Sequence, residues 1–276
     1  MKRSLLFLFL FASTFAVAQN IRVITYNIRY NNPGDGINAW PNRSKQVGAL
    51  LEFHQADIFG LQEALIGQLE DIQAQLQEMK WVGVGRDDGM KAGEFSPLFY
   101  NAEKFKALKQ GWFWLSETPE KPGLGWDAAC NRICTWLELQ DVKSKIRFMV
   151  FNTHFDHLGN VARVESAKLI LRKIKELNTE NLPEILTGDF NLTPEAEPIG
   201  VITNELSDSK KISKEEPYGP VGTFNGFKFE SPLNDRIDYI FVGKNIEVLQ
   251  YGVLSDSKDL RYPSDHLPVF VNLKFK

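Results

Sequence analysis

The amino-acid sequence predicts a mixed α/β protein that is built in layers and forms one domain. Segments with helical periodicity alternate with strand-like segments in the first third of the chain, and strand-like segments prevail afterwards. No linker rich in Pro, Gly, Ser or charged residues divides the 276 residues, and no tandem repeat is present. Hydrophobic residues make up 43% of the chain and charged residues 24%, which excludes a disordered tail and a disulfide-dense miniprotein.

Residues 1–18 have the pattern of a secretory signal peptide. Lys2 and Arg3 precede an apolar run, and Ala-Val-Ala at 16–18 forms a small-x-small cleavage site. The apolar run is soon interrupted and no later stretch is long enough to cross a bilayer, so we expect no stable membrane insertion. We expect an exported protein, secreted or periplasmic, with a single domain over residues 19–276.

The elements of the first third alternate between strand and helix. Residues 21–30 predict a strand because Ile, Val and Tyr are abundant there, and a turn-forming Asn-Asn-Pro-Gly-Asp-Gly sequence ends it. Asn42 is expected to cap a helix with apolar residues at helical spacing. Residues 57–61 predict a short strand, and residues 66–79 predict a second helix.

Strands dominate the rest of the chain. The longest amphipathic helix is expected at residues 161–178, where Ala167, Leu171, Ile174 and Leu177 form one apolar stripe. The other segments are rich in β-branched and aromatic residues and predict strands at 81–85, 97–100, 110–115, 135–139, 147–152, 185–188, 239–242, 246–254 and 269–275.

Charge and cysteine content exclude several classes of function. Lys+Arg 32 against Asp+Glu 35 gives a net charge of −3, so binding to nucleic acid or to an anionic membrane by bulk charge is not expected. A phosphate-bearing substrate stays compatible, because a bound metal ion can supply positive charge locally. Cys130 and Cys134 are too few for a disulfide framework, and they could pair only across a tight turn.

Polar residues stand where the predicted strands end and loops begin. Asn and Asp at any one strand end are explained by turn formation. Six such segments in one chain are not, because the strand ends at one edge of a sheet converge in space. The segments are Ile24-Thr25-Tyr26-Asn27, Phe59-Gly60-Leu61-Gln62-Glu63, Val150-Phe151-Asn152-Thr153-His154, Leu186-Thr187-Gly188-Asp189-Phe190-Asn191, Arg236-Ile237-Asp238-Tyr239-Ile240-Phe241 and Ser264-Asp265-His266-Leu267-Pro268-Val269.

This ordered set of motifs resembles the endonuclease/exonuclease/phosphatase superfamily, also called the DNase I-like fold. The resemblance covers residues 21–275, and its most specific parts are the segments around Asp189, Asp238 and His266. Residues 114–119, together with 125–127 and 132–136, resemble a secreted bacterial branch that is nearest in pattern to the deadenylase-like members. The resemblance implies a four-layer α/β/β/α sandwich of two mixed sheets.

The resemblance also implies a metal site. Asn27 and Glu63 would hold a hard divalent cation, and Asp265 would complete this site or a second one. Mg²⁺ is the expected ion, with Mn²⁺ as a substitute, because it tolerates one or two protein carboxylates and keeps waters that a substrate phosphate can replace.

Five residues receive catalytic roles from the resemblance. Asp189 would assist the attacking water as a base or orienting group, and Asn191 would position that water or a phosphate oxygen. Asp238 would fix the tautomer of His266 and raise its basicity. His154 matches the second phosphate-facing histidine of DNase I-like members. The expected reaction is an in-line attack of water on phosphorus.

Several residues beside the motifs have two interpretations each. Arg132 either holds the substrate phosphate bidentately or forms a surface ion pair, and the same holds for Arg29 and Arg43. Trp126 and Phe224 either stack on a base or sugar of the substrate or pack under a loop.

The remaining residues of this kind have mainly structural expectations. Trp40 is open to the same two interpretations as the other aromatic residues. His54 is expected at a helix end, and Asp156 and His157 as a loop pair rather than as metal ligands.

Three functions are compatible with these motifs. The leading hypothesis is an exported Mg²⁺-dependent phosphoesterase that hydrolyses a mono- or diester of a small molecule, a lipid headgroup or a nucleic acid. A nuclease acting on RNA or DNA is one alternative, although the clusters of Lys and Arg are thin. A non-catalytic phosphoester-binding protein is the other, and the presence of Glu63, Asp189, Asp238 and His266 argues against it. No protein partner is evident.

Overall fold

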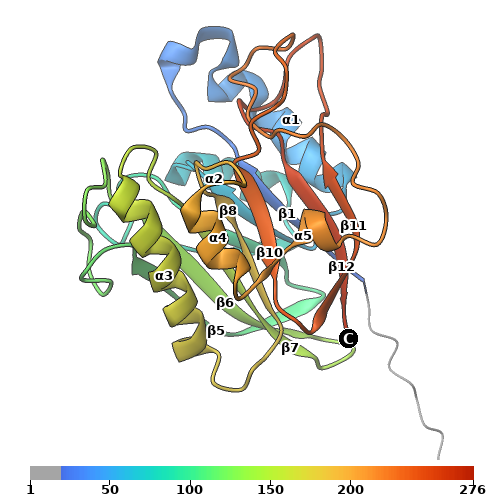
Figure 1. Ribbon diagram of the computed structural model, residues 1–276. Coiled ribbons are helices and arrows are strands. Elements are labelled where there is room, and N and C mark those ends of the chain that lie inside the picture. The colour runs from blue at the N-terminus through green and yellow to red at the C-terminus, as the bar shows by residue number, and fades with distance from the viewer. Residues whose placement is uncertain (1–19) are drawn as a thin grey trace, which may run out of the picture.

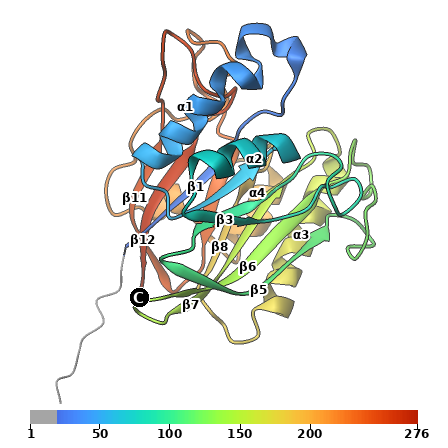
Figure 2. The same cartoon turned by 180° about the vertical axis from the view of Figure 1, so that it is seen from behind.

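Two six-stranded sheets pack face to face, and helices cover both outer faces (Figure 1). The structure is a computed structural model that describes residues 20–276, so the expected signal peptide and its cleavage site lie outside the described residues. α1 (Trp40–Phe53) and α2 (Ile66–Gln75) lie on one outer face, and α3 (Asn160–Leu177) and α4 (Glu197–Thr203) lie on the other, as the view from behind also shows (Figure 2). The four-layer sandwich expected from the sequence is confirmed.

The first sheet is built around the N-terminal strand. β1 (Ile21–Asn27) runs parallel to β2 (Ile58–Gln62) and antiparallel to β12 (Val269–Phe275), so the first and last strands of the domain are neighbours. The order of the sheet is β11-β12-β1-β2-β4-β3. The other strands of this sheet are β11 (Ile246–Val253), β4 (Leu98–Asn101) and β3 (Met79–Val82).

The second sheet also has a parallel pair near its centre. β7 (Arg147–His154) runs parallel to β8 (Glu184–Asp189), which pairs antiparallel with β10 (Asp238–Val242). The order of the sheet is β5-β6-β7-β8-β10-β9. The other strands are β5 (Phe105–Trp114), β6 (Ile133–Asp141) and β9 (Ser207–Asp208).

Three predicted elements end three or more residues earlier than the sequence indicated, and one of them is the strand expected at 81–85, which ends at Val82. β1 ends at Asn27 rather than Tyr30, because Arg29 takes a left-handed backbone conformation with φ of 54°. α2 ends at Gln75 rather than Met79, since Met79 begins the neighbouring strand β3.

Short elements were the hardest to predict. α1 begins at Trp40 with Ala39 as its N-cap, so the expected cap at Asn42 is wrong; Pro41, which favours the first helical turn, marks the start. Four short elements were not predicted, because none is long enough to show a hydrophobic period. They are α4, β9, α5 (Ser209–Ile212) and the 3₁₀ helix η1 (Pro33–Asn38). Within the described residues, no helix has the length and apolar character to span a bilayer.

The inner faces of the sheets change from apolar to polar along the strands. Side chains of a strand alternate between its two faces, so every second residue points between the sheets. At one end these residues form an apolar core, and at the other they are polar yet still buried. From the apolar to the polar end the inward residues are Val23, Thr25 and Asn27 on β1, and Ile185, Thr187 and Asp189 on β8.

A buried layer of hydrogen bonds joins the sheets below the polar end. Gln62 Nε2 donates to Thr25 Oγ1 at 3.0 Å and to Asn152 Oδ1 at 2.7 Å, and Thr187 Oγ1 lies 3.0 Å from the same Asn152 oxygen. All four side chains are inaccessible to solvent. Gly60 leaves the space for this crossing, because a Cβ there would collide with Asn152 and lie 2.6 Å from Thr187 Oγ1.

Gly60→Ala is therefore expected to destabilise the fold by about 1–3 kcal/mol, the usual cost of overpacking a core. Urea unfolding measures the change. The control is Gly200→Ala on α4, where an added Cβ meets nothing within 4 Å and is expected to stabilise by about 0.5–1 kcal/mol. Equal stability of the two variants would show that the layer does not restrain the spacing of the sheets.

Candidate active site

The polar end of the sandwich gathers the side chains that the sequence analysis singled out. The carboxyl ends of β1, β2, β7 and β8 meet there with the start of β10 and the loop before β12. Each of the following side chains contacts at least one other of the set or the Arg29 guanidinium that lies among them: Asn27, Glu63, His154, Asp189, Asn191, Asp238, Asp265 and His266.

The Asn27 amide connects the two sheets at this site. Asn27 Nδ2 donates to Glu63 Oε1 at 3.0 Å and to Asp189 Oδ2 at 2.9 Å, while its Oδ1 accepts from the backbone N–H of Arg29 at 3.0 Å. Asn27 is fully buried. Its side chain therefore fixes Glu63 of the first sheet relative to Asp189 of the second.

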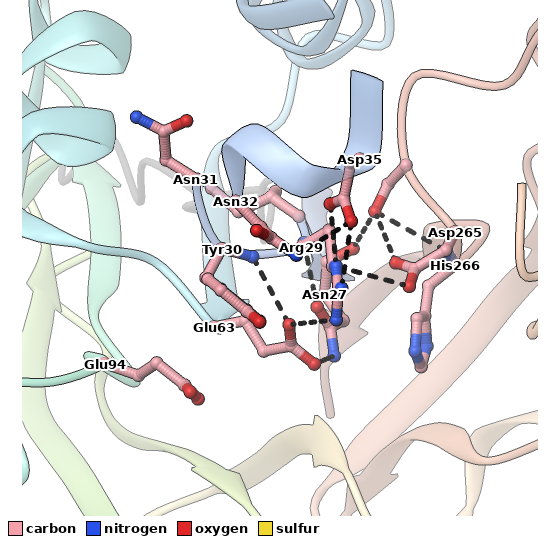
Figure 3. A network of polar contacts seen from close by, with 12 residues as sticks. Asn27, Arg29, Tyr30, Asn31, Asn32, Asp35, Glu63, Glu94, Asp265 and His266 are labelled. Atoms are coloured by element: carbon pink, nitrogen blue, oxygen red, sulfur yellow. Dashed lines mark hydrogen bonds and ion pairs between the residues drawn. The ribbon is translucent and has the colours of Figure 1, made fainter. Parts of the chain in front are cut away.

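Arg29 lies between the carboxylates of the first sheet (Figure 3). Its guanidinium forms two hydrogen bonds to Asp35, at 3.0 and 3.1 Å, and lies 3.8 Å from Glu63 Oε2 and 3.9 Å from Asp265 Oδ2. The sequence left open whether Arg29 holds a phosphate or forms a surface ion pair. In the structure it orders the acidic residues of the site.

His266 lies between two buried carboxylates of the second sheet. Its Nδ1 is 2.9 Å from Asp238 Oδ2, and its Nε2 is 3.8 Å from Asp189 Oδ2. Burial opposes a charge on His266, but Asp238 and Asp189 outweigh burial and hold the pKa of the imidazole well above its ordinary value. Burial, reinforced by the charge of Asp238, raises the pKa of Asp189 to about 7. Asp238 and Asp189 therefore favour the protonated, cationic form of His266.

His154 has the opposite charge preference. Burial, together with the positive charges of Arg132 and Arg86, lowers the pKa of His154 well below its ordinary value. The Asn191 amide lies 3.0 Å from His154 Nε2 and also donates to the Phe155 carbonyl. A neutral His154 accepts from Asn191 at Nε2, so the site contains one neutral and one cationic histidine.

A pocket of about 350 Å³ opens beside these groups. Arg86 and Glu94 lie on the wall of this pocket and were not predicted as site residues, because they belong to a loop without a strand-end motif. The only sequence feature that could have indicated this pair is that Arg86 and Glu94 carry opposite charges within one Gly-containing loop. The pocket is lined by Arg29, Tyr30, Glu63, Arg86, Glu94, Cys130, Arg132, His154, His157 and Asn191.

Arg132 is a buried part of the pocket wall. Its Nη2 lies 3.1 Å from His157 Nδ1, and its Nε lies 3.5 Å from Asp156 Oδ2. Asp156 in turn accepts from the backbone N–H groups of Leu158 and Gly159, at 2.9 and 2.7 Å. Arg132 thus forms a buried ion pair with Asp156 at the pocket. Asp156 also anchors the loop that follows it, which agrees with the loop position expected from the sequence.

The aromatic candidates separate into one at the site and two away from it. Phe224 is 40% exposed and places its ring edge-on to His266, with centroids 5.1 Å apart. Trp126 packs against the core under α3 and is not among the pocket-lining residues, so the structure does not support its expected stacking on substrate. Trp40 is also a core residue, 3% exposed.

Other open alternatives resolve as structural contacts. Arg43 is buried and donates to the backbone carbonyls of Asn38 and Arg29, at 2.8 and 2.7 Å. His54 pairs with Asp256 at 3.1 Å on the outside of the first sheet. Within residues 20–276 both cysteines are free thiols.

Three groups of side chains could hold a metal ion. Cys130, Asp156 and His157 have ligand atoms within 4.8 Å of one another, but Asp156 and His157 already contact the Arg132 guanidinium. Asp189, Asp238 and His266 have ligand atoms within 4.8 Å of one another, but Asp238 and His266 already bond to each other. Glu63 and Asp265 offer hard oxygen donors, the ligands that Mg²⁺ prefers. Burial and the negative charge of Glu63 raise the pKa of Asp265, so Arg29 does not fully compensate these carboxylates. A divalent cation fits here because it would remove the repulsion.

Comparison with known proteins decides the family. The sequence model of the Endonuclease/Exonuclease/phosphatase family matches residues 24–266. The chain belongs to this family. Its members hydrolyse phosphoesters and generally depend on divalent metal ions, so the protein is an enzyme of the phosphoester hydrolase class.

Solved structures of the family superimpose closely. An endonuclease/exonuclease/phosphatase family protein from Bacteroides thetaiotaomicron is 40% identical, with 94% of this chain and 99% of that chain covered and a TM-score of 0.91. A mannosyl-6-phosphatase from the same organism is 41% identical, with 92% and 100% covered and a TM-score of 0.89. The catalytic domain of human Nocturnin, solved with a bound sulfate anion, shares the fold at 21% identity, with 93% and 94% covered and a TM-score of 0.74.

Curated relatives match only part of their length. Uncharacterized protein L388 of Acanthamoeba polyphaga mimivirus is 27% identical over 162 residues, which cover 55% of this chain and 59% of that protein. Protein R895 of the same virus is 24% identical over 195 residues, which cover 57% of this chain and 28% of that protein. The chain therefore spans less than two thirds of either relative.

Asp238→Asn is expected to lower the pKa of His266, because a neutral amide removes the carboxylate charge that favours the imidazolium. NMR titration of the histidine ring nitrogens in metal-free protein measures this pKa. The pKa of His266 is higher in the folded than in the unfolded protein, so the His266–Asp238 pair stabilises the fold at low pH. This stabilisation is lost as the pH rises through the folded-state pKa of His266. The control is Asp256→Asn, beside His54, which should leave the pKa of His266 unchanged. If the pKa of His266 shifts only in this control, or in neither variant, Asp238 is not the group that holds it high.

Proposed function

We propose that this protein is an exported, Mg²⁺-dependent phosphomonoesterase that acts on a small phosphorylated carbohydrate. The observation that carries the proposal is the pocket of about 350 Å³ beside Glu63 and His154, a size suited to a small substrate. The 41% identity to a mannosyl-6-phosphatase supports a sugar phosphate as the substrate class. The pattern of residues 1–18 supports export.

A nuclease is less well supported by the distribution of charge. A nucleic-acid polymer needs a basic track that follows its backbone. Among the described residues, none of the three Lys/Arg clusters lines the pocket. They lie at β5, on α3 and around α5, and consist of Lys104, Lys106 and Lys109; Arg172, Lys173 and Lys175; and Lys210, Lys211 and Lys214.

The acidic residues of the first sheet would hold the cation. Glu63 and Asp265 would offer carboxylate oxygens and Asn27 its amide oxygen, as expected from the sequence, and Asn27 also keeps Glu63 in place through its 3.0 Å hydrogen bond. When bound, Mg²⁺ supplies positive charge that stabilises the oxygens of the reacting phosphoryl group.

The second sheet, with His266, supplies the groups that move or hold protons. Asp189 Oδ2 lies 3.5 Å from His154 Nε2 and 3.8 Å from His266 Nε2. A water bound to this carboxylate can give it a proton as the water oxygen attacks phosphorus, while the bond from phosphorus to the leaving sugar oxygen breaks and that oxygen takes a proton from solvent. His266, held cationic by Asp238, donates to a phosphoryl oxygen as negative charge grows. The backbone N–H of Asn191 donates to Asp189 Oδ1 at 2.8 Å and fixes the base.

The assay that tests this function compares phosphate monoesters with diesters. We expect Mg²⁺-dependent release of phosphate from mannose 6-phosphate and phenyl phosphate, with kcat/KM at least about tenfold above that for bis(p-nitrophenyl) phosphate and single-stranded RNA. EDTA should abolish the activity and added Mg²⁺ or Mn²⁺ should restore it.

The control for this assay is Asp189→Ala, purified in the same way, which should lower kcat by about 10²-fold or more because it removes the base. If Asp189→Ala were as active as the wild-type enzyme, the measured activity would come from a contaminating phosphatase. A preference for RNA or for diesters would overturn the monoesterase assignment, and full activity in EDTA would overturn the metal requirement.

A further inference from the structure

The loop between β3 and β4 brings a second carboxylate to the pocket. The Arg86 backbone N–H donates to the Glu94 carbonyl at 3.0 Å, which closes the loop. The next residue, Phe95, donates its N–H to the Ala64 carbonyl at 2.7 Å. Because Ala64 follows Glu63 directly, this bridge fixes Glu94 beside the acidic residue expected to bind the metal.

Glu94 is held rigidly by its partner. Arg86 Nη1 donates to Glu94 Oε2 at 2.7 Å, and Nη2 donates to Oε1 at 2.9 Å, which is a bidentate pair. The Trp114 indole donates to the Arg86 carbonyl at 2.7 Å and holds the backbone of the loop. The two side chains are only 14% and 19% exposed. The carboxylate is therefore positioned before any substrate binds.

The carboxylate of Glu94 keeps free acceptor capacity toward the pocket. A carboxylate has about four lone-pair sites, and Arg86 uses two of them. Glu94 lines the pocket, and its Oε2 lies 3.9 Å from His154 Nδ1. Figure 3 shows its carboxylate turned toward the side of the site where Glu63 lies.

Two other uses of Glu94 fit the surroundings poorly. A substrate phosphate would be repelled by its negative charge. A metal ion would have to share the carboxylate with the Arg86 guanidinium, whose positive charge would repel the cation. Uncharged hydroxyl groups, in contrast, donate to a carboxylate without either penalty.

We propose that Glu94, positioned by Arg86, accepts hydrogen bonds from hydroxyl groups of the substrate's leaving group and so selects phosphorylated polyols. This inference rests on the proposed phosphomonoesterase function and names the residue that chooses among monoesters.

The test compares two monoesters that differ in hydroxyl groups. Hexose 6-phosphate carries several hydroxyls in its leaving group, and phenyl phosphate carries none. We expect E94Q to lower the ratio of kcat/KM between hexose 6-phosphate and phenyl phosphate by about tenfold or more, because a site built to accept from a hydroxyl discriminates strongly once that acceptor changes. E70Q, which removes a charge from the outer surface of α2, is the matched control and should keep the wild-type ratio.

Deoxy substrates locate the hydroxyl that Glu94 accepts. With 2-, 3- and 4-deoxyhexose 6-phosphates, removal of the recognised hydroxyl should lower kcat/KM of the wild-type enzyme. On that deoxy substrate, the E94Q substitution should then change kcat/KM very little. This series also decides the matter on the wild-type enzyme if E94Q does not fold, since no loss with any deoxy substrate overturns the proposal.

The remaining outcomes are distinct. An unchanged substrate ratio in folded E94Q, or an equal loss on both monoesters, overturns the role in selection. A loss of Mn²⁺ affinity in E94Q, measured by electron paramagnetic resonance, would make Glu94 a metal ligand instead. Wild-type enzyme that cleaves phenyl phosphate but not hexose 6-phosphate overturns the polyol assignment while leaving the monoesterase function, and wild-type enzyme that cleaves neither overturns both.

Discussion

The site depends on hydrogen bonds that hold the two sheets in register at their polar ends. Asn27 donates across the interface to Asp189, and Gln62 donates to Asn152 one layer below. Buried polar groups are costly unless they are paired, so this arrangement is stable only in one relative position of the sheets. A slip of either sheet would separate Glu63 from Asp189. The same contacts that satisfy buried polar atoms therefore place the cation-binding and proton-transfer groups side by side.

Much of the fold could be predicted because each sheet repeats one simple pattern. β10 is a continuous apolar run from Tyr239 to Val242 and is buried on both faces, and the long helix α3 has a clear apolar stripe. The boundaries that failed have local causes that periodicity does not reveal. Arg29 adopts a positive φ that ends β1, and α1 starts at Trp40, directly before Pro41. The short helix α4 has too few turns to show a stripe.

The same reasoning explains which site residues could be predicted. Asp189 and Asp238 stand at strand ends and pair across the sheet, so their sequence position implied their meeting. Glu94 and Arg86 reach the pocket through a loop whose course depends on one bridge to Ala64, which no local pattern indicates. Trp126 stood beside a motif in the sequence but packs under α3, because proximity along the chain does not determine the face to which a side chain turns.

We infer that the first sheet holds the cation and that the second sheet, together with His266, holds the groups that act on water and phosphate. Crystals grown with Mn²⁺ and vanadate and measured at the manganese absorption edge would locate both ions. We expect one anomalous peak with oxygen ligands that include Glu63 and Asp265, and vanadate between that peak and the His154 and His266 rings. A manganese ion bound instead by Asp189, Asp238 and His266, or vanadate outside the pocket, would rule out this division of roles.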